Sequence, residues 1–338
     1  MPKVFIPQAG RSLDVNAGQT ILLAALAAGI PYPHGCKSGR CGSCKTRLVS
    51  GEVNLLPHTP FALSPEEQAD GLTLACRAQP LTDATAAWLG GADEIADIPV
   101  GRFEGAIAAV EDATHDIKLI RVRLDDRGGF TFKAGQYARF LYPGAPSRDY
   151  SVASRPDEEL VEFHVRRVPA GTASQRIWAR AAIGDRVAIE GPLGSAFLRE
   201  KHSGPILGIA GGSGLAPVKA VAETALAKGM GQPIRIYFGA RSEHDLYLLH
   251  RFAALTERHT NLSFVPVLSE DSGAGFRSGY VSDVVAADLG DLDGWKAYLA
   301  GPPAMVDAAG PVLLQRGLRA ADIHADVFYT PEYAKDPE

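Results

Sequence analysis

Four cysteines are the residues of this chain whose type and spacing could do the most distinctive chemistry. Cys36, Cys41 and Cys44 lie within the stretch CKSGRCGSC, and Cys76 follows after a longer interval. Thiolates in a C-x4-C-x2-C run with a distant fourth cysteine bind a [2Fe–2S] cluster. The spacing therefore predicts a metal site at these four residues, and such a cluster transfers one electron at a time.

Two other uses of the cysteines fit the pattern less well. Structural zinc usually takes two closely spaced pairs, whereas Cys76 stands alone. Disulfides are typical of secreted chains, but we see no apolar signal segment and no surplus thiol. Gly39 and Gly42 favour the cluster, because without a Cβ they let the backbone wrap tightly with its amides toward sulfur. We expect plant-type ferredoxin ligation, with zinc or inert thiols as the alternatives.

Composition and charge limit the classes of protein to which this chain can belong. The chain has 338 residues, of which 46% are hydrophobic and 22% are charged, so it can build two or three ordinary domains. A formal net charge of −5 argues against general nucleic-acid binding. The longest apolar stretch, ILLAALAAGI from Ile21, is too short to cross a bilayer. We expect a cytoplasmic monomer that binds neither nucleic acid nor membrane.

The elements that must position the cysteines fall in a first domain over residues 1–95. A helix is expected at Gln19–Ala28, and Ser64 with Glu67 predicts a capped short helix. Strands are expected at Val4–Ile6, Ser12–Val15, Thr46–Ser50 and Leu72–Ala78, the last one carrying Cys76. This pattern predicts a β-grasp-like α+β ferredoxin domain, and Leu89–Gly101 is expected to be a linker.

A second domain over residues 101–202 is rich in short strands, separated by Gly, Pro and Asp turns, with one helix near Ala173–Ala182. The expected strands are Glu104–Val110, Ile117–Leu124, Gln136–Tyr142, Asp149–Ala153, Leu160–Arg166 and Arg186–Glu190. Short strands at this spacing predict an antiparallel β-barrel.

A third domain over residues 203–338 alternates strands with helical stretches. The expected strands are Ile206–Ala210, Ile234–Phe238, Ser263–Leu268, Ala297–Ala300 and Ile323–Phe328. This alternation predicts an α/β domain with a parallel sheet and helices on both faces.

Two motifs on the barrel could bind a cofactor. Arg148-Asp149-Tyr150-Ser151 begins a strand, and Gly171 with Ser174 opens the single helix. Alone, each is weak evidence, because such an arginine usually lies on the surface and such a serine is usually only a cap. Together they resemble the flavin site of the ferredoxin–NADP reductase superfamily. There Tyr150 could stack on the flavin, while helix amides and Arg148 could bind its pyrophosphate.

Glycine-rich loops mark the third domain. Gly211, Gly212 and Gly214 directly follow an apolar strand and precede a helix, which raises a weak motif to good evidence for dinucleotide binding. The alternative is an ordinary tight turn. Ala300-Gly301-Pro302 ends another strand of the same sheet, where ligand crevices form.

In this order, the motifs resemble the iron–sulfur flavoprotein reductases of bacterial aromatic-ring oxygenases, over essentially the whole chain. The segments CKSGRCGSC, THDIKLIRVRL, KHSGPIL and HADVFY carry the resemblance. It implies FAD, a [2Fe–2S] cluster and NADH, or NADPH, as cofactors. It implies catalytic roles beside the flavin for Tyr150, Ser151 and Phe328. The implied cofactor-binding residues are Arg148, Tyr150, Ser151, Val165, Gly171 and Ser174 for FAD, and Gly211, Gly212, Gly214, Arg241 and Gly301 for the nicotinamide dinucleotide.

Two positions depart from the family pattern. Ala300 replaces a cysteine that the family often places near the site of hydride transfer. The strand Ile234–Phe238 is followed by Arg241, which could meet a 2′-phosphate, but Glu243 and Asp245 nearby would oppose one. The resemblance favours NADH.

The implied function is electron transfer from NAD(P)H through FAD and the cluster to a ferredoxin or a Rieske-type oxygenase. A flavin is required because nicotinamide gives up two electrons as a hydride while the cluster accepts one. The alternatives are a reductase for a di-iron monooxygenase or a deoxysugar-forming enzyme, and a non-enzymatic redox sensor.

Charged residues of the first domain admit two interpretations. Lys37, Arg40, Lys45 and Arg47 crowd the cysteine loop, either as solvated side chains that offset the cluster's charge or as a surface that attracts an acidic acceptor. The histidines that could be mistaken for ligands are expected to be surface or packing residues; they are His34, His58, His164 and His324.

Overall fold

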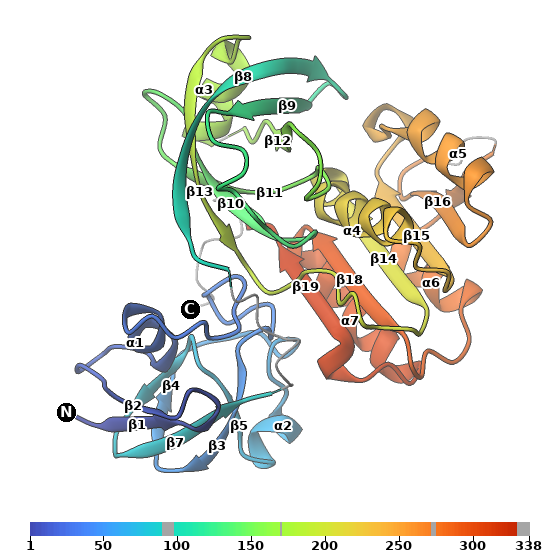
Figure 1. Cartoon of the computed structure of the whole chain (residues 1–338). Coiled ribbons are helices and arrows are strands. Elements are labelled where there is room, and N and C mark those ends of the chain that lie inside the picture. Colours follow the sequence, from blue (N-terminus) through green and yellow to red (C-terminus); the bar gives the residue numbers. More distant parts are fainter. Residues whose placement is uncertain (90–97, 170, 272–274, 330–338) are drawn as a thin grey trace. The chain divides into compact units, whose positions relative to one another are not determined.

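The computed structural model describes residues 1–89, 98–169, 171–271 and 275–329, and it divides the chain into two compact units (Figure 1). Unit 1 comprises Met1–Asp97 with the short segment Gly194–Ala196. Unit 2 comprises Ile98–Leu193 and Phe197–Glu338. All four cysteines therefore belong to unit 1, and both the strand-rich region and the strand–helix region belong to unit 2.

Unit 1 is a small α+β module built on a mixed sheet. Its elements are β1 (Lys3–Ile6), η1 (Pro7–Ala9), β2 (Arg11–Asp14), α1 (Ile21–Ala27), β3 (Lys45–Ser50), β4 (Val53–Leu55), α2 (Pro65–Ala69), β5 (Leu72–Leu74), β6 (Ala78–Pro80) and β7 (Ala84–Trp88). The strand order of the sheet is β2-β1-β7-β3-β5, in which β1 and β7 are parallel and the other neighbours antiparallel. β4 and β6 form a separate antiparallel pair.

The second helix of unit 1 begins where the sequence predicts, and the first begins at Ile21, two residues after the expected start. Ser64 and Glu67 form a capping box, because each side chain accepts a hydrogen bond from the other residue's backbone N–H. Thr20 caps α1 by accepting from the Leu23 N–H. In the core of unit 1, Tyr32 packs edge-on against Trp88, with ring centroids 5.1 Å apart, and its hydroxyl lies 2.7 Å from Thr46 Oγ1.

The segment that carries Cys76 differs from the predicted single strand Leu72–Ala78. β5 ends at Leu74, and a turn closed by a hydrogen bond from Arg77 N to the Leu74 carbonyl (2.8 Å) separates it from β6. The prediction was wrong because small and apolar residues continue through the turn without a Gly or Pro to mark it. The predicted linker Leu89–Gly101 lies mostly outside the described residues.

The first half of unit 2 is an antiparallel β-barrel. Its elements are β8 (Gly101–Asp112), β9 (Ile117–Leu124), β10 (Tyr137–Leu141), β11 (Arg148–Ser151), β12 (Val161–Arg166), α3 (Thr172–Arg180) and β13 (Arg186–Leu193). The order is β11-β10-β13-β8-β9-β12, with every neighbouring pair antiparallel. An antiparallel bridge between Val152 and Phe163 joins the two edge strands and closes the sheet. The predicted barrel is confirmed, although β8 and β13 are longer than expected.

The second half of unit 2 is an α/β domain on a parallel sheet. Its elements are β14 (Ile206–Gly211), η3 (Gly212–Gly214), α4 (Leu215–Ala227), β15 (Ile234–Ala240), η4 (Glu243–Asp245), α5 (Leu249–Arg258), β16 (Leu262–Leu268), β17 (Arg277–Ser278), α6 (Val281–Asp288), β18 (Lys296–Gly301), α7 (Pro303–Gln315), η5 (Ala320–Asp322) and β19 (Ile323–Val327). The order is β17-β16-β15-β14-β18-β19, and every neighbouring pair is parallel, as predicted.

Helices cover both faces of this sheet. A Cβ on Gly208 of β14 would lie 2.6 Å from Val218 of α4, whereas one on Gly239 of β15 would lie 3.2 Å from Val281 of α6. Gly208 pairs in register with Ile236, three residues before Gly239, so the two glycines face opposite sides. Among the described residues, no helix has the length and apolarity needed to span a membrane.

Candidate cofactor sites

The four cysteines come together on two segments of unit 1. Cys36, Cys41 and Cys44 lie in the loop between α1 and β3, and Cys76 lies in the turn after β5. All four are free thiols, of which Cys36 is half-buried and the others are buried. Their side chains influence each other in two pairs, since Cys41 shifts the pKa of Cys36 and Cys76 shifts that of Cys44. The predicted metal ligands thus converge from distant positions in the sequence.

Backbone amides point at the sulfur atoms. The N–H groups of Ser38 and Arg40 donate to Cys36 Sγ at 3.5 and 3.3 Å, and the N–H of Cys36 donates to Cys41 Sγ at 3.3 Å. The hydrogen bond to Cys41, followed by those from Ser38 and Arg40, lowers the pKa of Cys36 to about 5 against the effect of burial. These donors stabilise negative charge on sulfur.

The loop adopts this shape through left-handed backbone conformations. Lys37, Gly39 and Gly42 have φ values of 57°, 76° and 73°. A Cβ on Gly39 would also lie 2.7 Å from the Cγ atom of Arg77, so this position has no room for a side chain. Both glycines highlighted in the sequence are therefore needed by the backbone geometry.

The donor set fits a two-iron cluster. Four thiols with amide hydrogen bonds match the thiolate ligation of such clusters, and two pairs match the two ligands that each iron takes from the protein. Neither ring nitrogen of His34 is hydrogen-bonded to a cysteine, since its Nδ1 lies 2.8 Å from the Tyr32 carbonyl oxygen and its buried Nε2 has no hydrogen-bond partner among the described residues. The residues present therefore suit [2Fe–2S] ligation better than a mixed Cys–His site.

Lys45 and Arg47, among the basic residues around the cysteine loop, are bound to other side chains or carbonyls of unit 1. Lys45 Nζ lies 2.6 Å from Glu67 Oε1, and the Lys45 side chain is only 15% exposed. Arg47 donates to the Asp70 carbonyl at 2.6 Å. Lys45 in particular is thereby removed from any charged surface that an acceptor could reach.

A cavity of about 960 Å³ lies in unit 2, with walls from both the barrel and the parallel sheet. The predicted site residues that line it are Arg148, Tyr150, Ser151, Gly171, Ser174, Gly211, Gly212, Arg241 and Phe328. Val165, Gly214 and Gly301 do not line it. Val165 is fully buried in the barrel core, because side chains alternate along β12 and its neighbours His164 and Arg166 face the cavity instead.

Tyr150, Ser151 and Phe328 line the end of this cavity next to β19, since Ser151 is hydrogen-bonded to Asp326 of that strand. Ser151 is buried, and its hydroxyl donates to Asp326 Oδ2 at 2.8 Å, which joins the end of β11 to β19. Phe328 follows β19 and its N–H donates to the Gly301 carbonyl at 2.8 Å. Burial raises the pKa of Tyr150 to about 12, so its hydroxyl stays protonated at neutral pH. Asp326 was not predicted, although it lies within the segment HADVFY.

The loop before α3 is shaped by the predicted Ser174. Ser174 Oγ accepts from the Val168 N–H at 3.1 Å and donates to the Gly171 carbonyl at 3.3 Å. The hydroxyl therefore fixes the loop at the start of α3, where the first backbone amides of the helix have no partner within it. Arg148 is exposed at the cavity wall and donates to the neighbouring Ser147 carbonyl at 2.8 Å.

The glycine loop after β14 allows close backbone packing. A Cβ on Gly211 would lie 2.8 Å from Met305 Sδ, and one on Gly214 would collide with the Ala300 carbonyl. Gly212 has a φ of 54°, and Gly301 has a φ of 146°. The motifs that end β14 and β18 therefore touch each other, and glycine is required in both. Ala300 is buried beneath them.

Behind the glycine loop lies a buried polar network of Glu162, His164, Lys219, Glu223 and Tyr247. Glu162 Oε1 lies 3.0 Å from Lys219 Nζ and 3.2 Å from His164 Nε2. His164 Nδ1 lies 2.9 Å from the Tyr247 hydroxyl, which is also 3.3 Å from the Gly212 carbonyl. The network links the barrel to the loop that would hold a dinucleotide.

This network was missed from the sequence, where His164 was treated only as a surface or packing residue. A signal was present in the helix LAPVKAVAETALA, which carries Lys219 and Glu223 four residues apart on an otherwise apolar surface. The two side chains are 2% and 3% exposed, with Lys219 Nζ 3.7 Å from Glu223 Oε2. Charged residues inside an apolar helix are seldom buried unless they are paired.

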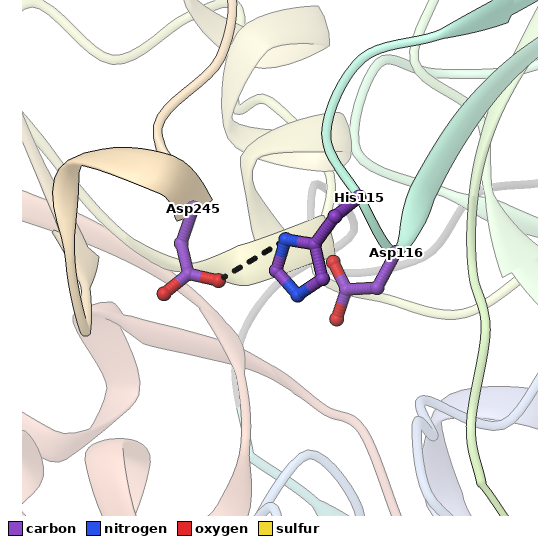
Figure 2. A group of neighbouring side chains, drawn as sticks. All are labelled: His115, Asp116 and Asp245. Carbon is purple, nitrogen blue, oxygen red and sulfur yellow. Dashed lines mark ion pairs between the residues drawn. The ribbon is translucent and has the colours of Figure 1, made fainter.

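A second unpredicted contact lies at the other end of the cavity. Figure 2 shows His115, Asp116 and Asp245 together, with His115 Nδ1 3.9 Å from Asp245 Oδ1. Each carboxylate already has an arginine partner, since Asp116 pairs with Arg166 (2.7 Å) and Asp245 pairs with Arg241 (3.2 Å). The group therefore serves ion pairing rather than metal binding.

Comparison with known proteins places each region in a described domain class. Residues 4–81 match the 2Fe-2S iron-sulfur cluster binding domain, residues 104–197 the oxidoreductase FAD-binding domain, and residues 209–310 the oxidoreductase NAD-binding domain.

Whole-length relatives show the same order of domains. The chain is 39% identical over 318 residues to the ferredoxin–NAD(P)+ reductase component of naphthalene 1,2-dioxygenase/salicylate 5-hydroxylase systems from Ralstonia sp., covering 94% of this chain and 95% of that protein. It is 38% identical over 333 residues to the reductase component of the naphthalene 1,2-dioxygenase system of Pseudomonas putida, covering 97% and 98%. The crystal structure of an Amycolatopsis cytochrome P450 reductase is 37% identical, with a TM-score of 0.75 and coverage of 97% and 99%.

Proposed function

The chain belongs to the family of iron–sulfur flavoprotein reductase components of oxygenase systems, and on that premise we propose how its own residues divide the work of an NAD(P)H-dependent reductase. The family resemblance and the fold class predicted from the sequence are confirmed. The protein is an oxidoreductase whose cofactors are FAD, a [2Fe–2S] cluster and a nicotinamide dinucleotide. The proposal rests on one observation: the same chain has both two pairs of neighbouring thiols and a cavity walled by the barrel and the parallel sheet.

In unit 1, we assign cluster ligation to Cys36, Cys41, Cys44 and Cys76. When bound, FAD would accept a hydride from the nicotinamide and release its electrons singly, and the cluster would carry them one at a time. The amides of Ser38 and Arg40 would stabilise the ligating sulfur of Cys36.

In the unit 2 cavity, we assign the flavin to the barrel wall. Arg148 and the amides at the start of α3 would bind the pyrophosphate, with Gly171 and Ser174 setting the shape of the loop. Tyr150 and Phe328 would face the flavin ring. Ser151 would lie beside the ring with its hydroxyl oriented by Asp326, and Val165 would contribute only from the barrel core.

We assign the nicotinamide dinucleotide to the ends of the parallel strands. Gly211 and Gly212 would admit its pyrophosphate to the backbone, while Gly214 and Gly301 would allow β14 and β18 to pack closely enough for the crevice to form. Because Ala300 is buried and carries no thiol, positioning of the nicotinamide would fall to Ser151 and the packing of Phe328. Arg241 would meet the far end of the dinucleotide.

These assignments imply three domains: a ferredoxin domain over residues 1–95, a FAD domain over 101–202 and a nicotinamide domain over 203–338. The three matched regions, 4–81, 104–197 and 209–310, fall inside those limits. The described structure groups the second and third domains in unit 2.

We propose that the electron acceptor is a ferredoxin or a Rieske-type oxygenase component, by analogy with the naphthalene dioxygenase systems of the relatives. A different class of oxygenase is the alternative, favoured by the similarity to a cytochrome P450 reductase. The cytoplasmic location and the monomeric state stay predictions from the sequence.

The proposal is tested by supplying the purified holoprotein with NADH and, in turn, a Rieske ferredoxin, a Rieske oxygenase and a bacterial cytochrome P450. Reduction of a Rieske protein at the highest rate is the expected result. Reduction of none of them, while NADH still reduces ferricyanide, would assign the reductase to another acceptor. Failure to oxidise NADH with any acceptor would contradict the proposed function itself.

A further inference from the structure

The order of the strands in the parallel sheet indicates where each part of a bound nicotinamide dinucleotide would lie. This step rests on the function proposed above. Phe328 follows β19, Gly212 follows β14, and Arg241 follows the next strand, β15. The strand order is β15-β14-β18-β19, so β15 and β19 are three interstrand spacings apart, each of about 4.8 Å. With the nicotinamide beside Phe328 and the pyrophosphate at Gly212, the adenosine ribose would lie beside Arg241.

Arg241 is neutralised at this position by Asp245. Arg241 Nη2 lies 3.2 Å from Asp245 Oδ1, and both residues line the cavity. The Asp245 side chain is 13% exposed, whereas that of Arg241 is 54% exposed. The carboxylate is the better fixed of the two, because its Oδ2 accepts from both the backbone N–H (3.1 Å) and the hydroxyl (3.2 Å) of Ser242.

Asp245 is ionised where it meets the cavity. Burial alone would raise the pKa of Asp245, but the hydrogen bonds from Ser242 and the charge of Arg241 outweigh it and lower that pKa. His115 approaches the same carboxylate from the β8–β9 turn (Figure 2). Asp271 also lies nearby, since its carboxylate accepts from the Glu243 N–H at 3.3 Å. At this end of the cavity, two carboxylates are therefore each paired with an arginine, Asp245 with Arg241 and Asp116 with Arg166.

The geometry points to Asp245 as a specificity-determining residue that selects NADH over NADPH. A ribose 2′-hydroxyl can donate a hydrogen bond to the carboxylate, in the way that acidic residues at this place in other dinucleotide folds accept from it. A 2′-phosphate would have to break the pair with Arg241 and place its charge against a poorly exposed carboxylate. Arg241 alone would favour NADPH by binding its 2′-phosphate, but with Asp245 beside Arg241 the site favours NADH.

The test compares flavin reduction by NADH and NADPH in the holoprotein and in the variant Asp245→Asn. Asparagine keeps an oxygen that can accept from Ser242 but removes the charge, so Arg241 becomes available to a phosphate. We expect the ratio of kcat/KM for NADPH to that for NADH to rise by about tenfold or more, since 1.4 kcal/mol corresponds to a factor of ten. Asp125→Asn is the control, because it removes the same charge from a pair with Arg186 on the barrel, outside the cavity.

A binding measurement provides a readout that does not depend on activity. Calorimetry with 5′-AMP and adenosine 2′,5′-bisphosphate should show that only Asp245→Asn gains affinity for the bisphosphate. Adding Arg241→Gln to Asp245→Asn should remove that gain, because the guanidinium supplies it. Asp245→Glu, which keeps the charge, should keep the preference for the probe without the 2′-phosphate.

Three results would overturn the inference: a wild-type protein that prefers NADPH, an unchanged ratio in Asp245→Asn, or an equal shift in Asp125→Asn. Because the adenosine probes need no redox chemistry, these results differ from a failure of the proposed function, in which neither nucleotide reduces the flavin. Flavin content and thermal unfolding of Asp245→Asn establish that the variant is folded. If Asp245→Asn does not fold, binding of the same two adenosine probes to Asp245→Glu and to the wild type tests the inference instead.

Discussion

The cysteine loop of unit 1 and the cavity of unit 2 are two cofactor sites built in different ways. The loop takes three of its four thiols from one short stretch, and its own amides and left-handed residues aim the backbone at sulfur. The cavity takes its walls from residues between His115 and Tyr329, and the buried ion pair between Lys219 and Glu162 connects the parallel-sheet half to the barrel. A local site of this kind should fail when a ligand is changed, whereas an assembled site should also be sensitive to residues that touch no cofactor.

The largest effect is expected from Cys76→Ser, which removes the ligand farthest in sequence from the other three. Reduction of a one-electron protein acceptor should fall by more than the roughly 10–100-fold that loss of an outer-sphere partner costs. Flavin reduction by NADH should be retained, because the cavity lies in unit 2. Stopped-flow absorbance and iron content measure the two properties separately. Loss of NADH–ferricyanide activity together with acceptor reduction would contradict the separation of the two sites.

A stability loss of up to about 3–5 kcal/mol is expected from Lys219→Met, since the buried Glu162 loses one of its two cationic partners and keeps only Arg121, at 2.7 Å. Burial alone would raise the pKa of Glu162, but His164, Lys219 and Arg121 together hold that pKa well below its usual range. Urea unfolding followed by flavin fluorescence measures the change in free energy of unfolding.

The control for that measurement is Lys228→Met at the end of the same helix. Lys228 pairs with Glu200 at 2.8 Å, but both side chains are 47% exposed, so the cost should be below about 1 kcal/mol. Similar losses in the two variants would mean that the buried network is no more important than a surface pair.

A kinetic effect of about 10–100-fold is expected from Ser151→Ala or Asp326→Asn. Their hydrogen bond of 2.8 Å involves a carboxylate, and bonds to charged groups contribute about 1.5–3 kcal/mol. If Asp326 acts by positioning Ser151, the double variant should lose little more than Ser151→Ala alone. The rate constant of flavin reduction by NADH, at saturating nucleotide, is the measurement. Additive losses would show that Asp326 acts independently of Ser151.

A pH effect of about 1 kcal/mol per pH unit is expected at His324 on β19. Burial, followed by the charges of Arg199 and Lys296, holds the pKa of His324 well below its usual value. Below about pH 6.5 the unfolded chain therefore takes up a proton that the folded chain does not, so stability falls as the pH falls. His324→Phe should reduce this slope between pH 6.5 and 5 in urea titrations. An unchanged slope would mean that His324 is protonated in the folded protein.

The smallest effect, a few-fold change in rate, is expected from Arg40→Glu at the cysteine loop. If the loop attracts an acidic acceptor, this variant should slow acceptor reduction and weaken its salt dependence while NADH–ferricyanide activity stays the same. Arg11→Glu makes the same change of charge on β2, at the opposite edge of the sheet from β5. Equal effects of the two variants would show that net charge, and not the cysteine loop, controls acceptor reduction.

The difference between the sites also explains what the sequence could predict. The ligand spacing, the glycines and the capping box at Ser64 are local patterns, and each appears in the structure where expected. The turn at Cys76 was missed because nothing in its residues interrupts the strand pattern. Asp326 and the partners of Lys219 were missed because a single charged residue does not reveal which distant strand it will meet. Only folding brings Ser151 to Asp326 and His164 to Tyr247.

The central claim is that one chain passes electrons from a nicotinamide dinucleotide in unit 2 to the thiol-bound cluster of unit 1. An anaerobic titration of the holoprotein with NADH, following flavin and cluster absorbance together, tests it most directly. The account predicts that both centres bleach, and that Cys76→Ser bleaches only at the flavin. Bleaching of the flavin while the wild-type cluster stays oxidised would contradict it.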